Sequence, residues 1–302
     1  MQIIKYFAVS SILFLFFYDT CGQEIARKQC EKYTNNIERI EIQKSIPRSS
    51  RQTRHIVGGT RSAPSEFPFM AALGYGDIEN IQWECGGSLI SEKFVLTAAH
   101  CASHRELGPI RIIRLGTTNL RLPIGRSPAQ DIEMQQVMIH PKYSAPIMYN
   151  DIALVELKKA VDFSSTVLPA CLDTDPRLIN VPLIAMGWGR LDFAGDLSDD
   201  LMKVTLSLST QEECSKAYET ESSRKLNRGI QSDTQICAGG TGNNPHDTCQ
   251  GDSGGPLQME SGNKHIIVGI TSFGKACGIS NIPGVYTKVS AFVPWLETIV
   301  WK

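Results

Sequence analysis

The chain has almost no net charge, because its 30 Lys and Arg residues nearly offset its 31 Asp and Glu residues and leave a formal charge of −1. It therefore has no basic surplus of the kind that nucleic-acid-binding proteins carry, and we expect no nucleic-acid partner. Asn-x-Ser/Thr acceptor sites are also absent, so ordinary N-glycosylation is not expected. What the 302 residues do have is apolar content, since 42% of them are hydrophobic, which is enough for a large buried core.

Long apolar runs are missing beyond the N-terminus. The run Tyr6–Tyr18 follows Lys5 and contains 13 residues, fewer than the roughly 20 that a helix needs to span a bilayer. The small residues Thr20 and Gly22 suit the positions before a signal-peptidase cut. We therefore expect residues 1–22 to be a secretory signal peptide rather than a membrane anchor. The protein is predicted to be secreted and extracellular, with no membrane partner.

Helical periodicity is scarce before the C-terminus. Short runs rich in β-forming residues recur instead, each bounded by Gly, Pro or Asn. These runs include Phe94–Leu96, Arg111–Ile113, Ile266–Val268 and Val285–Tyr286. One helix is predicted over 290–299, with Ser290 as its cap and Pro294 in its first turn. Many short strands and one terminal helix predict an all-β fold, either a sandwich or a barrel.

The cysteines indicate an oxidising compartment. Of nine cysteines, Cys21 falls in the expected signal peptide, and the even number that remains predicts four disulfides in a secreted protein. Their pairing does not follow from the sequence alone. The pair His246-x-x-Cys249 is a possible zinc pattern, but no second pair matches it, so we expect no metal site.

A glycine-rich motif, Gly251-Asp252-Ser253-Gly254-Gly255-Pro256, carries the first sign of chemistry. Its glycines allow close backbone approach, and the amides of Gly251 and Ser253 are able to converge on one oxyanion. A serine hydroxyl becomes a good nucleophile only beside a base that a third group orients. Thr97-Ala98-Ala99-His100 supplies a histidine and Asn150-Asp151 a carboxylate. Each residue alone is more often structural, but the three motifs together favour catalysis.

These motifs, in the order His, Asp, Ser, resemble those of the trypsin/chymotrypsin-fold serine proteases from Ile56 to the C-terminus. The resemblance implies that Ser253 attacks a substrate carbonyl, that His100 takes and returns the proton, and that Asp151 orients the imidazole. It also implies two six-stranded antiparallel β-barrels, over about 56–169 and 170–302, with the active site between them. No cofactor is expected.

The same resemblance suggests how the cysteines pair. Three disulfides are implied within the protease domain, and the fourth would tether the segment 23–55 to it. The implied pairs are Cys85–Cys101, Cys214–Cys237, Cys249–Cys277 and Cys30–Cys171.

Substrate preference is implied by three further positions. Asp247 matches the base of the family's primary specificity pocket, where a carboxylate would pair with Arg or Lys of the substrate. Gly274 and Gly284 would line the walls without blocking a long side chain. We therefore expect cleavage after Arg or Lys in protein substrates that expose these residues.

Ile56-Val57-Gly58-Gly59 matches the N-terminus that activation creates in this family. The resemblance implies that the freed amine of Ile56 pairs with Asp252, an ion pair that is costly to break when buried. His55 precedes the bond, and Arg54 lies one position too early for a tryptic cut. We expect a different, upstream protease to cut after His55. The alternative is a cut after Arg54 followed by trimming.

The polar segment 23–55 is predicted to be an exposed, cleavable linker. Around Cys30 it resembles the linker of arthropod clip-domain proteases, yet only Cys21 and Cys30 precede His55, so the clip module itself is lacking. The resemblance implies an extracellular cascade of the immunity or melanisation type, with a serpin-type inhibitor. A venom or digestive protease, or a non-catalytic homologue, are the alternatives. The intact triad argues against the last.

Some members of this fold bind calcium in the loop that here follows Gly116. Thr117-Thr118-Asn119 replace the glutamate ligands there, and Asp131 and Glu133 come too late in the loop. Because calcium requires several oxygen ligands, we expect no calcium of this type.

Overall fold

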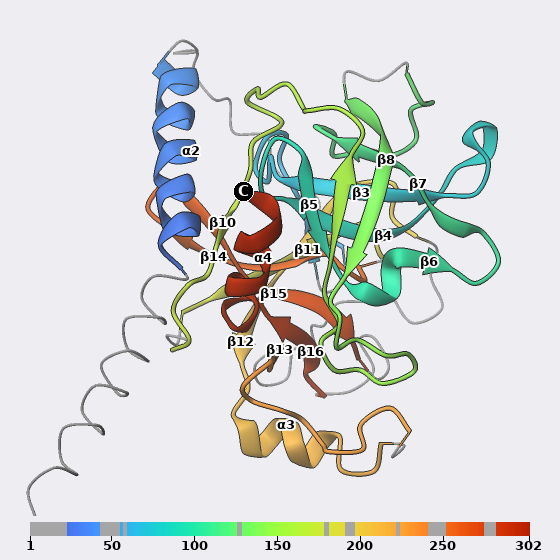
Figure 1. Cartoon of the computed structure of the whole chain (residues 1–302), viewed down its shortest axis with the longest axis vertical. Coiled ribbons are helices and arrows are strands. Elements are labelled where there is room, and N and C mark those ends of the chain that lie inside the picture. The colour runs from blue at the N-terminus through green and yellow to red at the C-terminus, as the bar shows by residue number, and fades with distance from the viewer. Residues whose placement is uncertain are drawn as a thin grey trace, which may run out of the picture.

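The computed structural model describes residues 23–42, 55–56, 59–125, 129–177, 181–190, 197–221, 224–240, 252–274 and 282–302. Two β-barrels pack against each other, and a long helix lies along the outside of the molecule (Figure 1). The helices in the described part of the chain include none that is long and apolar enough to cross a membrane. The expected signal peptide, residues 1–22, lies outside the described residues.

The first barrel is built from a seven-stranded sheet of order β3-β4-β5-β9-β8-β7-β6, which closes through a pairing of β3 with β7. Two-residue β6 pairs only with β7, so six strands form the closed barrel. Side chains such as Leu73, Ile113 and Leu154 fill its interior and are fully buried. The strands are β3 (Met70–Tyr75), β4 (Gln82–Leu89), β5 (Phe94–Thr97), β6 (Ser103–His104), β7 (Gly108–Leu115), β8 (Gln130–Ile139) and β9 (Ala153–Leu157).

The second barrel closes in the same way, by a pairing of β12 with β13. Its six strands are β11 (Leu183–Gly187), β12 (Met202–Leu208), β13 (Gln235–Gly239), β14 (Pro256–Ser261), β15 (Lys264–Phe273) and β16 (Gly284–Lys288). Three short strands extend this sheet outside the barrel: β1 (His55–Ile56), β2 (Gly59–Arg61) and β10 (Cys171–Leu172). The predicted all-β fold of two six-stranded antiparallel barrels with a C-terminal helix is confirmed.

The C-terminal helix begins later than predicted. Helix α4 spans Val293–Val300, with Phe292 as its N-cap and Pro294 in its first turn. Ser290 is buried in the preceding 3₁₀ turn η3 (Val289–Ala291) and caps nothing. Two further 3₁₀ turns, η1 (Ile78–Asn80) and η2 (Ala99–Ala102), lie in the first barrel.

Helix α2, which spans Glu24–Ile42, corrects the prediction of an exposed linker for this part of the segment 23–55. Residues 43–54 lie outside the described residues. No Gly or Pro interrupts this stretch, and Ala26, Cys30 and Tyr33 recur at helical spacing. Ala26 and Tyr33 are only 3% and 4% exposed, because this face packs against β10 and α4. The Glu297 carboxylate of α4 accepts a hydrogen bond from the Ala26 amide at 2.7 Å, which satisfies a donor at the start of the helix.

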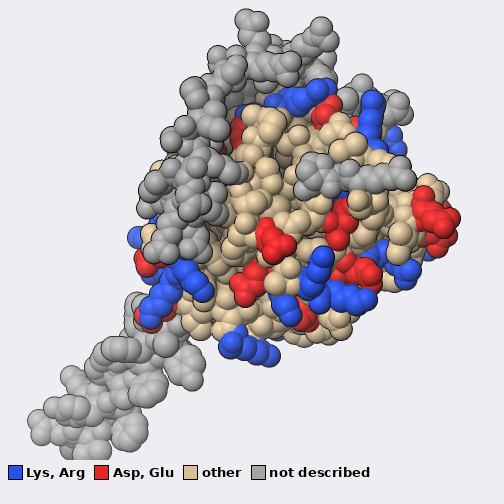
Figure 2. All heavy atoms as spheres, turned by 90° about the horizontal axis from the view of Figure 1, so that it is seen from above, with Lys and Arg blue, Asp and Glu red and all other residues tan. Residues whose placement is uncertain are grey.

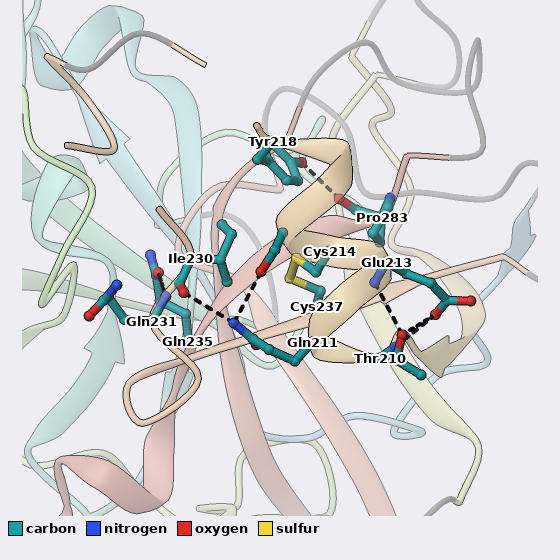
Figure 3. The surroundings of a disulfide bond; sticks show 11 residues. Thr210, Gln211, Glu213, Cys214, Tyr218, Ile230, Gln231, Gln235, Cys237 and Pro283 are labelled. Carbon is teal, nitrogen blue, oxygen red and sulfur yellow. Dashed lines mark hydrogen bonds between the residues drawn. A yellow bond between two sulfur atoms is a disulfide. The ribbon is translucent and has the colours of Figure 1, made fainter. Parts of the chain in front are cut away.

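Three disulfides staple the described residues: Cys30–Cys171, Cys85–Cys101 and Cys214–Cys237. The first joins α2 to β10, across 141 positions of sequence. Figure 3 shows the third, which joins helix α3 (Gln211–Ala217) to β13. Helix α3 starts in a capping box, in which Thr210 and Glu213 bond each other's backbone amides. The expected pair Cys249–Cys277 lies outside the described residues.

Positive and negative side chains alternate with uncharged ones over the face shown in Figure 2. Among the residues coloured there, neither sign gathers into a large patch. This distribution agrees with the formal charge of −1.

Candidate active site

His100 and Asp151 form the centre of the site. His100 lies in η2, directly after β5, and Asp151 comes just before β9, the neighbour of β5 in the sheet. The Asp151 side chain is fully buried, and its Oδ2 lies 2.8 Å from His100 Nδ1. Its Oδ1 accepts the backbone N–H of His100 at 2.9 Å. The carboxylate therefore fixes both the position of the histidine and the orientation of its ring.

The second barrel also holds Asp151, through two residues whose part in the site the sequence did not reveal. Ser272 Oγ of β15 donates a hydrogen bond to Asp151 Oδ2 at 2.5 Å. Thr287 Oγ1 of β16 donates to the Asp151 backbone carbonyl at 2.8 Å. The sequence placed Ser272 only in the stretch Ser272-Phe273-Gly274 of the expected pocket wall, and its contact with Asp151 joins positions 121 apart.

The pair is electrostatically coupled. Burial lowers the pKa of the His100 imidazole, but the charge and the hydrogen bond of Asp151 raise it, and the net shift is upward. Burial raises the pKa of the Asp151 carboxyl, but the charge of His100, the hydrogen bonds from its ring and its backbone, and that from Ser272 lower it, and the net shift is downward. Asp151 therefore stays ionised, and it favours a proton on Nδ1.

Ser253 lines the same pocket as His100, a hollow of about 450 Å³ on the first-barrel side of the site. The backbone around Ser253 is anchored to both barrels, because Gly86 N of β4 donates to Ser253 O at 2.8 Å and Gly254 N donates to Thr271 O of β15 at 2.9 Å. Gly254 has a φ of +74°, and a Cβ there would collide with Thr97 Oγ1. Only glycine fits this turn.

Asp252 points away from this pocket, toward β11 and the residues that follow it. Its Oδ1 accepts the backbone N–H of Gly189 at 2.9 Å. A Cβ on either Gly187 or Gly189 would collide with the Asp252 carboxylate, so both positions require glycine. The structure thus places Asp252 in a close-fitting niche of the second barrel.

The remaining predicted site residues are only partly described. Gly284 begins β16, and Gly274 directly follows its neighbour β15, so the two expected pocket walls lie on adjacent strands. His55 and Ile56 form β1, where His55 pairs with Thr60 of β2. Asp247, expected at the base of the pocket, and Gly251, expected in the oxyanion hole, lie outside the described residues.

One group of described side chains has the spacing of metal ligands, but the structure does not support a metal centre there. The ligand atoms of Cys85, His100 and Cys101 lie within 4.8 Å of one another. Both sulfurs are already bonded in the Cys85–Cys101 disulfide, and His100 Nδ1 is bonded to Asp151. These three residues therefore cannot form a metal site of the usual kind. The His246–Cys249 pair lies outside the described residues.

Comparison with known proteins agrees with this geometry. The family model for Trypsin matches residues 56–296. The chain is 40% identical over 298 residues to serine protease snk of Drosophila melanogaster, covering 93% of this chain and 66% of that protein. It is 33% identical to CLIP domain-containing serine protease B4 of Anopheles gambiae, over 82% of this chain and 71% of that one. It is 38% identical to a venom protease of Bombus pensylvanicus, over 79% and 96%.

The chain spans 66% of the length of serine protease snk and 39% of serine protease Hayan of Drosophila melanogaster. The resemblance to clip-domain proteases is confirmed, and the intact histidine and serine agree with the relatives' names as proteases. The chain belongs to the trypsin family of serine proteases and is related to the arthropod clip-domain proteases.

Proposed function

We propose that this protein is the zymogen of a secreted endopeptidase that cleaves after Arg or Lys. The observation that carries the proposal is the His100–Asp151 pair, a buried carboxylate bonded at 2.8 Å to a histidine that shares a pocket with Ser253. With its Nδ1 engaged by Asp151, the imidazole has Nε2 left to accept a proton. His104 lines the same pocket, but its Nδ1 accepts the backbone amides of Glu106 and Leu107, whereas His100 is bonded to a buried carboxylate.

The proposed reaction has two stages. Ser253 Oγ attacks the substrate carbonyl while His100 Nε2 takes its proton, and Asp151 stabilises the imidazolium that forms. The amides of Gly251 and Ser253 would stabilise the oxyanion. His100 then gives the proton to the leaving amine as the peptide bond breaks. Water, deprotonated by the same imidazole, hydrolyses the acyl-enzyme and restores Ser253.

Specificity for Arg and Lys is proposed on Asp247, Gly274 and Gly284. Support for this pocket comes from the two expected walls, which lie on the paired strands β15 and β16. Gly284, at the start of β16, has no side chain that would block a long substrate residue. A carboxylate at the base of such a pocket would form a charge-assisted pair with a guanidinium or ammonium group.

Activation is proposed to require a cut between His55 and Ile56. The new amine of Ile56 would pair with Asp252, whose carboxylate already rests against Gly189. Since a pocket that selects Arg or Lys disfavours His55, the cut falls to an upstream protease. A cut after Arg54 with later trimming is the alternative. The product would keep residues 23–55 as a light chain bound to the protease domain, residues 56–302, through Cys30–Cys171.

The setting that fits best is an extracellular proteolytic cascade, with a protein substrate, an activating protease and a serpin-type inhibitor. Its support is the similarity to CLIP domain-containing serine protease B4 and to phenoloxidase-activating factor 1 of Holotrichia diomphalia. The similarity to bumblebee venom proteases favours a venom role as the second candidate. A digestive role fits less well, because the tethered helix α2 is unlike a short propeptide.

The test is a zymogen whose residues 51–55 are replaced by an enteropeptidase recognition sequence. After cleavage, we expect hydrolysis of an Arg-anilide and a Lys-anilide but not of a Phe-anilide. Ser253→Ala should abolish the hydrolysis, and Asp247→Ser should remove the preference for basic residues. Cleaved protein without amidase activity would refute the proposal.

A second experiment tests whether the protein is able to cut its own activation bond. The wild-type zymogen, incubated with a catalytic amount of its own active form, should remain uncut. His55→Arg places a basic residue directly before Ile56 and should make the zymogen self-activating. Rapid self-activation of the wild type would contradict the need for another protease.

A further inference from the structure

Arg114 on β7 is a buried cation that the proposed reaction does not use. It is 1% exposed, and its Nε and Nη2 donate to the two oxygens of Asp131 at 2.7 and 2.9 Å. Its Nη1 donates to the carbonyl oxygens of Leu122 at 2.6 Å and of Leu120 at 3.3 Å. The ring of Trp83 covers the guanidinium, with its centroid 4.9 Å from Cζ.

Through these bonds, Arg114 gathers the loop that joins β7 to β8. Arg114 and Asp131 are direct partners in the register of the two strands, so the ion pair closes the base of the loop. The Asp131 carboxylate also accepts the amide of Gly125 at 2.9 Å. The Arg114 guanidinium therefore binds a carboxylate and two backbone carbonyls, which are the kinds of oxygen ligand that a calcium ion binds. The loop therefore carries its own cation.

The ordered loop is bonded to the second barrel. Leu201 N donates to Thr118 O at 2.7 Å, and Leu120 N donates to Asp199 O at 2.9 Å. Asn119 Nδ2 donates to Asp200 Oδ1 at 2.8 Å. We refer to residues 197–201 as the brace segment, because these three bonds join it to the loop of the first barrel.

The brace segment also touches both sides of the proposed activation switch. On one side, Asp200 pairs with Arg61 at 2.5 Å and Leu201 O accepts Ser62 N at 2.8 Å, which fixes the strand that follows Ile56. On the other side, Ser198 N donates to Gly189 O at 3.2 Å, and it is Gly189 whose amide holds Asp252.

We propose that Arg114 is a positioning residue for activation: a built-in cation that orders the loop 116–125 and, through the brace segment, stabilises the state in which the Ile56 amine is paired with Asp252. This inference rests on the proposed function. Removing Arg114 shifts the cleaved enzyme toward the unpaired state, without changing the chemistry of molecules in which the pair has formed. It also follows that the loop needs no calcium.

The test uses the full chain with the enteropeptidase site, cleaved and kept well below its melting temperature. Arg114→Met removes the charge, Arg114→Lys keeps it but loses the two-pronged geometry, and Arg111→Met is the control on the exposed face of the same strand. A fluorophosphonate titrates competent active sites, and cyanate reports how accessible the Ile56 amine is. Turnover per titrated site separates population from chemistry.

For Arg114→Met we expect the titratable fraction to fall about fivefold or more, with faster carbamylation of Ile56 and unchanged turnover per titrated site. Arg114→Lys should lie between, and Arg111→Met should match the wild type. Equal titratable fractions in Arg114→Met and Arg111→Met would overturn the proposal. If Arg114→Met does not fold, Asn119→Ala removes the side-chain bond to Asp200, one of the bonds to the brace segment, while leaving Arg114 paired, and it should give the same phenotype in milder form.

A calcium arm is independent of catalysis. The uncut Ser253→Ala protein should melt at the same temperature in calcium chloride and in EDTA, because Arg114 fills the cation's place. A calcium-induced rise would contradict a built-in cation. If the cleaved wild type hydrolyses no Arg-anilide, the proposed function is refuted. The calcium experiment needs no activity, so it would still test the role of Arg114 in the loop.

Discussion

Replacing Asp131 by Asn should destabilise the protein more than removing Asp131 and Arg114 together. The two side chains are 6% and 0% exposed, so Asp131→Asn leaves a full positive charge buried without its counter-charge. Breaking a buried pair in this way costs about 3–5 kcal/mol, whereas replacing both partners by apolar residues is often neutral. The double variant Arg114→Met/Asp131→Leu still loses the bonds to Leu120, Leu122 and Gly125, of which the bond to Leu120 is buried and the other two are partly or fully exposed to solvent. We expect it to cost about 1–2 kcal/mol.

Thermal unfolding followed by circular dichroism measures the effect, in a Ser253→Ala background that prevents self-digestion. At about 2–4 °C per kcal/mol, Asp131→Asn should lower the melting temperature by roughly 6–20 °C, and the double variant by roughly 2–8 °C. Glu133→Gln is the matched control, because this carboxylate on the same strand pairs with Lys158 in the open, with both side chains more than half exposed. Equal shifts for Asp131→Asn and Glu133→Gln, or a double variant as damaged as the sum of the singles, would refute the reasoning.

Three further predictions concern titratable groups. His100 must be neutral to act as a base, and its pKa is raised above the ordinary 6.5. Activity should therefore fall as the pH is lowered, with a midpoint above this value. In a Ser253→Ala background, Asp151→Asn should lower the midpoint of the His100 titration measured by NMR. Burial raises the pKa of Asp173 from 3.8 to about 6. Its charged form weakens the fold as the pH rises through that range, so Asp173→Asn should match the wild type near pH 4 and exceed it by about 1–2 kcal/mol at pH 8 in chemical denaturation. Glu297→Ala leaves the 3%-exposed Ala26 amide without its acceptor, a loss of about 1–3 kcal/mol. It should reduce hydrogen-exchange protection across α2, whereas Glu297→Gln, which keeps an acceptor, should change it less.

Much of the fold and the centre of the site could be predicted, because the information is local in sequence. The segments around His100, Asp151 and Ser253 are short and specific in residue type, and their order along the chain distinguishes the family. The tether of Cys30 to Cys171 was implied in the same way. The roles of these residues in catalysis stay predictions until they are tested.

What escaped prediction depends on contacts between distant residues. Ser272 reaches Asp151 from the other barrel, and no local pattern reports such a contact. Arg114 lies in a strand whose second half is buried without alternation, so no period-2 pattern in the sequence marks this charged side chain as buried. Helix α2 was missed because its average polarity outweighed the helical spacing of Ala26, Cys30 and Tyr33. Its stability comes from packing on the protease domain, a tertiary effect that the residues of the segment alone do not reveal.

The way Asp151 is held limits how this enzyme is able to move. It belongs to the first barrel and yet receives hydrogen bonds from Ser272 and Thr287 of the second. A rotation of one barrel against the other would break these two hydrogen bonds and disturb the carboxylate that orients His100. We therefore expect the two barrels to keep a fixed relative position when a substrate binds, with changes in shape confined to the surface loops.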